Sequence, residues 1–257
     1  MIEQLFAVDG KVAVVTGGTR GIGFMIAQGF VEAGARVIIA SRKADDCEEA
    51  AATLSAHGHC IGIAADLSTE AGAAAFAAEV AKHEPAVDIL VNNAGANWGA
   101  PLDEFPDSGW DKVFDLNLKG VFHTTVKFLP ALRRNATAED PARIINIGSI
   151  DGIQVPLLET YSYSACKAGL HHMTRVLAKR LAREHMTVNC VAPGPFESKM
   201  MAQTLRDFGD QIAGSNPRGR IGTPEDMAGV SLFLASRAGA YITGVILPVD
   251  GGAATTL

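Results

Sequence analysis

Residues Lys11 to Gly23 read KVAVVTGGTRGIG, and this segment is the strongest indication of the fold class. It begins with an uninterrupted apolar run, typical of a strand buried on both faces of a sheet, and ends in a glycine-rich turn. Gly17, Gly21 and Gly23 follow the spacing G-x-x-x-G-x-G instead of G-x-G-x-x-G. The physical demands are the same, because the chain must turn sharply, let a pyrophosphate approach the backbone and open a helix toward the anion. No Gly-Lys-Ser/Thr follows, so a P-loop is excluded.

The same alternation of strand and helix continues along the chain. Apolar strand-like runs begin near residues 11, 35, 59, 87, 142, 186 and 244, and we expect helices over 21–33, 44–57, 69–83, 109–133, 161–185 and 224–235. Strand–helix–strand repeats of this kind form right-handed crossovers and a doubly wound parallel sheet with helices on both faces. No linker or break in composition interrupts the pattern, so we expect one α/β domain over residues 1–257.

The composition is that of a folded globular protein. The chain has 257 residues, of which 48% are hydrophobic and 19% charged, and its formal net charge is −6. An acidic balance without a long basic run argues against nucleic acid as a partner. No apolar stretch approaches the about 18 residues that a membrane-spanning helix needs, so we expect no membrane association.

The cysteines indicate a reducing compartment. They are Cys47, Cys60, Cys166 and Cys190. None forms a CxxC pair, and the N-terminal residues lack the apolar core of a secretory signal. We therefore expect free thiols and a cytoplasmic protein. His57 and His59 precede Cys60 but have no further ligands nearby, so we expect no metal site.

The end of the second strand bears on the choice of dinucleotide. A site that selects NAD places an acidic residue there for the ribose 2′-hydroxyl. This chain instead has Ser41 followed by Arg42, with Arg20 in the glycine loop. Two guanidinium groups suit a 2′-phosphate, so we expect NADP(H) to be favoured over NAD(H). The alternative interpretation is an ordinary basic, solvated strand end.

Two tyrosines precede a lysine in the stretch YSYSACKAG, Tyr161 to Gly169. In a helix, each residue turns the chain by about 100°, so Tyr163 and Lys167 lie roughly 40° apart on one face. Tyr161 is about 120° away from Lys167. Tyr163 is therefore the candidate for chemistry with the lysine, and the alternative is a half-buried tyrosine packed over a surface lysine.

Several motifs in a fixed order carry a family resemblance. They are Thr16–Gly23 (TGGTRGIG), Asn92–Gly95 (NNAG), Asn117 in DLNLKG, Ser149 in NIGSI, Tyr163–Lys167 (YSACK), and Pro193-Gly194 with Ser198 after them. Over essentially its full length, the chain resembles the short-chain dehydrogenase/reductase family. The resemblance implies a single-domain Rossmann fold with a seven-stranded sheet, a nicotinamide cofactor, and hydride transfer to or from a small-molecule carbonyl or alcohol. It also implies a homotetramer built partly on helices 109–133 and 161–185.

The resemblance assigns four catalytic residues, namely Asn117, Ser149, Tyr163 and Lys167. Tyr163 would be the general acid in reduction, and we expect the ammonium of Lys167 to lower its pKa. Ser149 would donate a hydrogen bond to the substrate oxygen. Asn117 would hold a water that relays protons past Lys167, a role that is compatible with an ordinary capping or kinking asparagine.

The resemblance also implies a set of cofactor-binding residues. These are Gly17, Thr19, Arg20, Gly21, Ile22, Gly23, Ser41, Arg42, Asp66, Leu67, Asn93, Ala94, Gly95, Tyr163, Lys167, Pro193, Gly194, Phe196 and Ser198. Asp66 would meet the adenine and Ser198 the nicotinamide carboxamide. Both residues have an alternative role as helix caps.

The substrate is less closely defined. Residues 195–222 occupy the place of the family's substrate lid, and Met201, Leu205, Phe208 and Ile212 recur at helical spacing. This stripe is either an apolar lid over an acyl chain or a face packed on the core. The subgroup that the chain resembles most is the 3-oxoacyl thioester reductases, which includes the reductase linked to rhamnolipid synthesis.

At two positions the chain differs from particular branches of the family, and these differences bear on the reaction and on the partner. Enoyl reductases of the family place their tyrosine seven residues before the lysine, where this chain has Thr160, so carbonyl reduction is favoured. Members that use an acyl carrier protein have a basic residue near the end of the helix that holds tyrosine and lysine, where this chain has Glu184. Arg133 and Arg134 are possible substitutes, and recognition of a carrier protein is left open.

Three functions remain. The first is an NADPH-dependent reductase of 3-oxoacyl thioesters or similar ketones. The second is an NAD(P)-dependent dehydrogenase of a sugar, polyol or steroid alcohol. The third is a catalytically silent dinucleotide-binding regulator, which the presence of Asn117, Ser149, Tyr163 and Lys167 argues against.

Overall fold

The fold is a doubly wound parallel sheet. The structure, a computed structural model, describes residues 2–198 and 201–256, without the side chains of 202–205 and 215. The strands are β1 (Val12–Thr16), β2 (Arg36–Ser41), β3 (Cys60–Ala64), β4 (Ile89–Asn92), β5 (Ala142–Ile147), β6 (Met186–Pro193) and β7 (Ile246–Val249). All pair in parallel, in the order β3-β2-β1-β4-β5-β6-β7. The strand order reverses beside β1, and a crevice for a ligand is expected there, outside the carboxyl ends of the strands.

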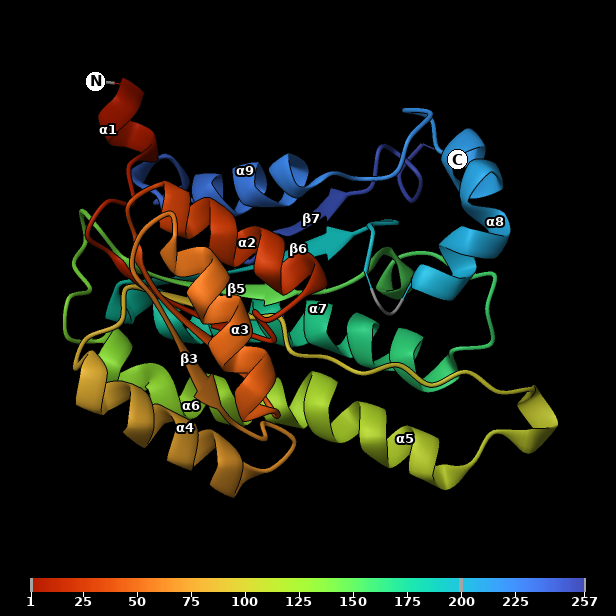
Figure 1. The fold of residues 1–257 in the computed structure, drawn as a ribbon, viewed down its shortest axis with the longest axis horizontal. Coiled ribbons are helices and arrows are strands. Elements are labelled where there is room, and N and C mark those ends of the chain that lie inside the picture. The colour runs from red at the N-terminus through yellow and green to blue at the C-terminus, as the bar shows by residue number, and fades with distance from the viewer. Residues whose placement is uncertain (1, 199–200, 257) are drawn as a thin grey trace.

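Helices cover both faces of the sheet (Figure 1). They are α1 (Ile2–Phe6), α2 (Gly21–Glu32), α3 (Ala44–Ser55), α4 (Glu70–His83), α5 (Asp107–Phe114), α6 (Val121–Leu132), α7 (Tyr161–Leu181), α8 (Ala202–Ser215) and α9 (Pro224–Ala235). In Figure 1, β6 and β7 point toward the end of the molecule where α8 lies. The predicted strands are confirmed, as are the predicted helices other than 109–133, and α9 agrees with its predicted range at both ends.

The predicted helix 109–133 was wrong in one respect. It is not one regular α-helix, because a π-helical turn, Asp115–Gly120, separates α5 from α6. Such a turn closes hydrogen bonds one residue further along than an α-helix does, so it inserts a residue and shifts the face of the helix. Asn117 lies within this π-helical turn, and its side chain forms hydrogen bonds with Ala96 in the loop after β4.

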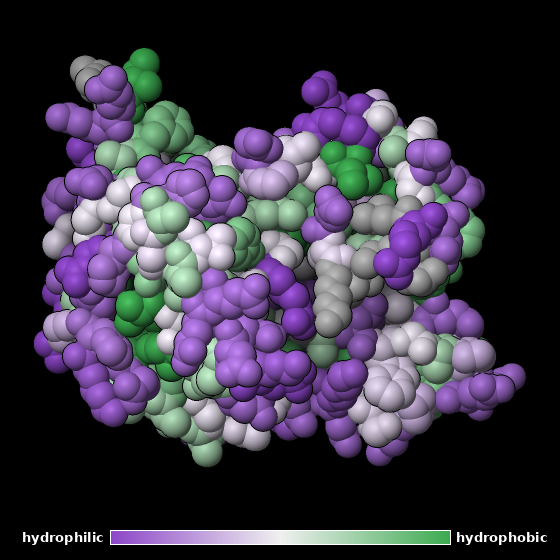
Figure 2. Space-filling view, in the orientation of Figure 1, coloured by the Kyte–Doolittle hydropathy of each residue, from purple (hydrophilic) through white to green (hydrophobic). Residues whose placement is uncertain are grey.

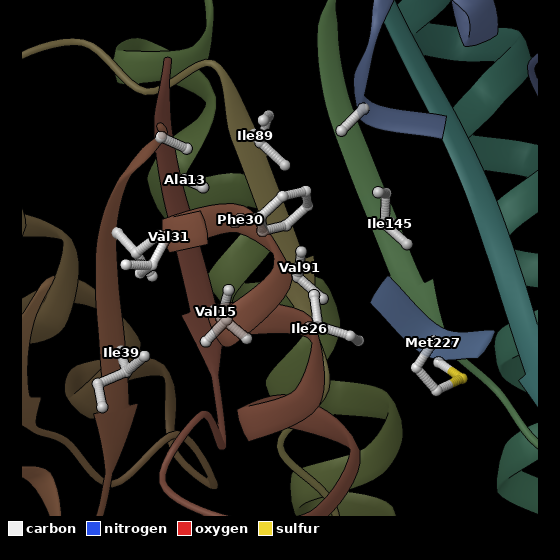
Figure 3. Packing of buried hydrophobic residues seen from close by; sticks show 14 of the residues in the cluster. Ala13, Val15, Ile26, Phe30, Val31, Ile39, Ile89, Val91, Ile145 and Met227 are labelled. Carbon is white, nitrogen blue, oxygen red and sulfur yellow. The ribbon is translucent and has the colours of Figure 1, made fainter. Parts of the chain in front are cut away.

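Alternate residues of each strand supply two separate hydrophobic cores. Val15 and Val91 pack against α2 and α9, where Phe30 is fully buried and Met227 closes the layer (Figure 3). Val14 and its neighbours pack on the other face against α4, α6 and α7. This two-sided burial explains why the strands are apolar throughout instead of alternating.

The outer surface shown in Figure 2 is mainly hydrophilic, with hydrophobic residues scattered among polar ones. In the part of the chain that the structure describes, no helix has the length and apolar character needed to cross a bilayer.

Candidate active site

The glycine-rich turn joins β1 to α2 and is packed too tightly for side chains. Gly17 and Gly21 have φ angles of +66° and +55°, a region that side chains disfavour. A Cβ on Gly17 would lie 2.9 Å from Nδ2 of Asn93, and one on Gly23 would overlap the carbonyl oxygen of Gly17. The turn therefore keeps its backbone exposed to the crevice at the start of α2, as phosphate binding requires.

Asn93 ties this turn to the end of β4. Its Nδ2 donates hydrogen bonds to the carbonyl oxygens of Thr16 and Gly17, each at 3.0 Å. In return, Oγ1 of Thr16 accepts from the backbone N–H groups of Asn93 and Ala94 at 2.9 and 3.0 Å. The two loops at the switch point are thus locked together by side chains on both strands.

Apart from Tyr163 and Lys167 on α7, the predicted cofactor residues gather at the carboxyl edge of the sheet. Their positions are Gly17, Thr19, Arg20, Gly21, Ile22 and Gly23 after β1; Ser41 and Arg42 at the end of β2; Asp66 and Leu67 after β3; Asn93, Ala94 and Gly95 after β4; and Pro193, Gly194, Phe196 and Ser198 at the end of β6. The segments after β1 and β6 approach each other closely at one point. The Cβ of Ser198 lies 3.2 Å from the position that a Cβ on Gly21 would occupy.

Four of these residues have surroundings that the sequence does not reveal. Phe196 and Leu67 are buried in the cores, so only their backbones can face the crevice. Arg20 is exposed, with NH1 3.7 Å from Oδ2 of Asp46 on α3. The carboxylate of Asp66 accepts from Oγ of Ser68 at 2.7 Å. This bond, followed in effect by the backbone of Ser68 and the charge of Arg42, lowers the pKa of Asp66.

Tyr163, Lys167 and Ser149 come together although Ser149 belongs to another segment. Nζ of Lys167 lies 5.4 Å from the centre of the Tyr163 ring and donates to the carbonyl oxygen of Ile147 at 2.7 Å. Ser149 follows β5 and begins the 3₁₀ turn Ile150–Gly152, where its Oγ accepts from the N–H of Asp151 at 3.1 Å. Because that oxygen accepts from the backbone, its own proton is available to another acceptor.

The expectation that Lys167 lowers the pKa of Tyr163 was wrong for this structure. Burial raises the pKa of Tyr163 to about 12, and the hydrogen bond with Ser149 opposes the rise only in part. The lysine lies over the ring and donates to Ile147 instead of to the phenol oxygen. Burial also lowers the pKa of Lys167 to about 8. The phenol is therefore a proton donor throughout the neutral range.

Tyr161 lies away from this group, as the helical geometry predicts. Its hydroxyl donates to Oε1 of Glu159 at 2.7 Å, and its ring makes an edge contact with Phe105 at 5.4 Å between centroids. Trp110 packs on the other side of Phe105. Tyr161 is thus part of an aromatic wall and does not contact Lys167.

Asn117 is fully buried within the π-helical turn. Its Oδ1 accepts from the N–H of Ala96 at 2.8 Å, and its Nδ2 donates to the carbonyl of the same residue at 2.9 Å. Both ends of the amide are therefore occupied by the loop after β4. The side chain therefore ties that loop to the turn between α5 and α6.

A buried polar chain beneath the site was missed by sequence analysis. Nδ2 of Asn92 donates to Oγ1 of Thr125 at 3.0 Å and to Oδ1 of Asn146 at 2.9 Å, and Nδ2 of Asn146 donates to Oγ1 of Thr174 at 2.9 Å. It links β4 and β5 to α6 and α7. The available signal was a polar residue inside an apolar strand, as in RIINI, since such a residue needs a buried partner.

The predicted lid contains α8 on the carboxyl edge of the sheet. Met201 is half-buried and Phe208 is 55% exposed, whereas the side chain of Leu205 lies outside the described part of the chain. The described residues contain no cluster of three or more histidine, cysteine or acidic side chains that could hold a metal ion.

His171 lies one turn after Lys167 on α7 and is only 5% exposed. A Cβ on Gly148 would overlap its Nε2, an atom with no hydrogen-bond partner. Burial, with the charges of Lys167 and Arg175, lowers the pKa of His171 to about 4. The unfolded chain therefore takes up a proton at this residue below about pH 6.5, while the folded chain stays neutral until about pH 4.

We expect this histidine to make the protein less stable as the pH falls from about 6.5 to 4, by about 3 kcal/mol at 1.36 kcal/mol per pKa unit. Urea unfolding across this range, at one protein concentration, measures the effect. His171→Gln should flatten the curve, and the same change at its exposed neighbour His172 should not. Parallel curves for wild type and His171→Gln would contradict the prediction.

Comparison with known proteins identifies the family. A family model described as enoyl-(acyl carrier protein) reductase matches residues 17–254. The chain belongs to the short-chain dehydrogenase/reductase family, and it is an oxidoreductase.

Individual relatives are similar over almost their whole length. The rhamnolipids biosynthesis 3-oxoacyl-[acyl-carrier-protein] reductase of Pseudomonas aeruginosa is 50% identical over 253 residues, which is 98% of this chain and 99% of the relative. The galactitol 2-dehydrogenase of Rhizobium johnstonii is 37% identical over 256 residues, or 97% of each chain. The solved structure of the P. aeruginosa RhlG/NADP active-site complex has a TM-score of 0.94 and 50% identity, covering 97% of this chain and 98% of that one.

Proposed function

We propose that the protein is an NADPH-dependent reductase that transfers hydride to the ketone of a 3-oxoacyl thioester or a similar carbonyl compound. The observation that carries the proposal is the meeting of Tyr163, Lys167 and Ser149 at the carboxyl edge of the sheet, on the side where the glycine turn opens α2. Support for the substrate class comes from the relative that is 50% identical and is named a 3-oxoacyl reductase.

The residues divide the work of reduction among them. NADPH, when bound, supplies the hydride. Tyr163 gives its proton to the carbonyl oxygen as negative charge develops there, and its raised pKa keeps that proton in place at neutral pH. The hydroxyl of Ser149, held through its oxygen by Asp151, donates a second hydrogen bond to the same oxygen. Lys167 lies over the tyrosine ring and donates to the carbonyl of Ile147, so in this proposal it holds the ring in place instead of lowering the pKa of the phenol.

The residues at the edge of the crevice fit a phosphorylated dinucleotide. The glycine turn leaves room for a pyrophosphate at the start of α2, and Arg42 is exposed at the end of β2. In our proposal Arg42 meets the 2′-phosphate, and Arg20 joins it by exchanging its long contact with Asp46 for the stronger anion. The solved relative with 50% identity is described as an NADP complex.

Two other activities are less well supported. The family model is described by enoyl reduction, but the position of the enoyl branch's tyrosine is Thr160, which is 4% exposed and donates to the carbonyl of Leu158. A sugar or polyol dehydrogenase is the second candidate, because galactitol 2-dehydrogenase is 37% identical.

The basic residues near the end of α7 bear on whether an acyl carrier protein is a partner. Arg133, a possible contact for a carrier protein, is paired with Glu184 at 2.7 Å, and Arg180 pairs with the same carboxylate at 2.6 Å. Glu184 thus offsets only part of the positive charge that Arg133 and Arg180 place at this end of α7. We therefore include both coenzyme A and carrier-protein thioesters in the test.

We further propose a cytoplasmic homotetramer. Phe122 and Val126 on α6 and Val176 on α7 are 43%, 37% and 55% exposed, an apolar surface on the two helices that the family resemblance places at an interface. The four cysteines are buried free thiols, which suits a reducing compartment.

NADPH oxidation over a substrate panel tests the proposed function. Acetoacetyl thioesters of coenzyme A and of an acyl carrier protein, a β-ketoester, keto-sugars and a steroid ketone should be offered at equal concentration. We expect the highest kcat/KM among the 3-oxoacyl compounds. Preferred turnover of a sugar would transfer the assignment to the second candidate, and tight NADPH binding without any turnover would indicate a regulator.

A further inference from the structure

One carboxyl group at the site has no part in the proposed reaction. Asp151 is the second residue of the 3₁₀ turn that follows Ser149, and its N–H donates to Oγ of that serine at 3.1 Å. The same short turn therefore holds a proton donor for the substrate and, two residues later, an acidic side chain.

This turn packs directly on α7 beside the reactive pair. A Cβ on Gly152 would lie 2.7 Å from the carbonyl carbon of Lys167 and 2.8 Å from Cε1 of His171. No side chain separates the turn from the helix, so the backbone holds Asp151 close to Lys167. The electrostatics agree. After burial, the carboxylate adds to the raised pKa of Tyr163 and opposes the lowered pKa of Lys167, and the lysine acts on the carboxylate in return.

The carboxylate has no hydrogen-bond donor among the described residues. No hydrogen bond to the carboxylate is found among these residues. Neither of its oxygens is a fully buried polar atom that lacks a partner. Asp151 is only half-buried, so its free oxygens keep contact with solvent. A carboxylate without a structural partner, on a turn packed against α7 beside Lys167, is placed to act on whatever binds there.

We propose that Asp151 is a specificity residue that disfavours substrates with a carboxylate near the reacting ketone and so favours neutral esters and thioesters. The inference rests on the proposed function, since the ketone oxygen must meet Tyr163 and Ser149. A carboxylate a few bonds from that oxygen would approach Asp151, and like charges in a partly desolvated site repel strongly. The 3-oxoacyl thioester has no such charge, whereas a keto acid has.

The surrounding groups set the sign of the effect. From α7 the site faces Lys167, Tyr163 and His171, and from β6 it faces Cys190. The phenol and the thiol both have a pKa of about 12 and the imidazole of about 4, so all three are neutral at pH 7. Lys167 is the cation that acts on Asp151. Removing the carboxylate leaves this ammonium unopposed, which should attract an anionic substrate.

The test compares two substrates that differ in charge, ethyl acetoacetate and acetoacetate, with NADPH at pH 7. We expect Asp151→Asn to lower the ratio of kcat/KM for the ester over the acid by about tenfold or more. Asp151→Glu should keep the ratio high. Asp103→Asn, the same change at an exposed position in the 3₁₀ turn Leu102–Glu104, should leave the ratio at the wild-type value. Intrinsic fluorescence with NADPH shows that each variant folds and binds cofactor.

The pH course separates a charge effect from a merely structural one. Burial raises the pKa of Asp151 above its ordinary value, so the wild-type ratio should fall as the pH is lowered toward that pKa, while Asp151→Asn should show no such fall. Equal losses on both substrates, with an unchanged ratio, would overturn the inference and leave the reductase assignment intact. A wild type that reduces neither 3-oxo compound, nor any other in the panel, would overturn both.

Discussion

Tyr163→Phe is expected to lower kcat for carbonyl reduction by about 10²–10⁴, the usual worth of a positioned general acid. The substitution removes only the hydroxyl and keeps the aromatic ring, whose centre lies 5.4 Å from Nζ of Lys167. NADPH affinity should therefore change little, because the lysine keeps its bond to the carbonyl of Ile147. Steady-state kinetics with a saturating ketone, together with a direct NADPH titration, measure the two quantities.

Tyr161→Phe is the matched control. It removes the same atom two residues earlier, where the hydroxyl donates to Glu159 and points away from Lys167. Its activity should stay close to that of the wild type. If Tyr161→Phe were the less active variant, the assignment of the acid to Tyr163 would be wrong and the helical geometry would have no bearing on the chemistry.

The second large effect is expected in the cofactor. Arg42→Ala should weaken NADPH binding by roughly ten- to a thousand-fold, because losing one or two hydrogen bonds to a charged phosphate costs about 1.5–4 kcal/mol in total. Ser41→Asp combined with Arg42→Ala adds repulsion toward the 2′-phosphate and offers a carboxylate to a free 2′-hydroxyl. We expect the double variant to prefer NADH.

The measurement is kcat/KM for both cofactors in wild type and variant, at low and high salt. The wild-type preference for NADPH should shrink with salt, since Arg42 is exposed and the contact is screened. Arg183→Ala, which removes an exposed positive charge at the far end of α7, should leave the preference unchanged. A wild type that already prefers NADH, or a double variant with unaltered preference, would leave Arg42 as an ordinary solvated residue.

Most of the candidate site residues were predicted from the resemblance of the ordered motifs to a known family. The periodicity of the sequence then assigned these residues to helices, strands and turns. Tyr163 and Lys167 share a helix, so 3.6-residue periodicity was enough to predict that they face each other. The strands could be found because burial on both faces makes them continuously apolar, and the glycines because a tight turn excludes side chains. Each of these properties depends on residues close together in the chain.

Local residue patterns were thus enough to predict the alternation of strands and helices, the glycine turn and the face shared by Tyr163 and Lys167. The tertiary structure decided that Ser149 and Asp151 lie against that face, that Asn117 is bound by Ala96, and that burial raises the pKa of Tyr163. The reason is physical. Desolvation and contacts between distant segments depend on how the helices pack on the sheet, and no local periodicity encodes them.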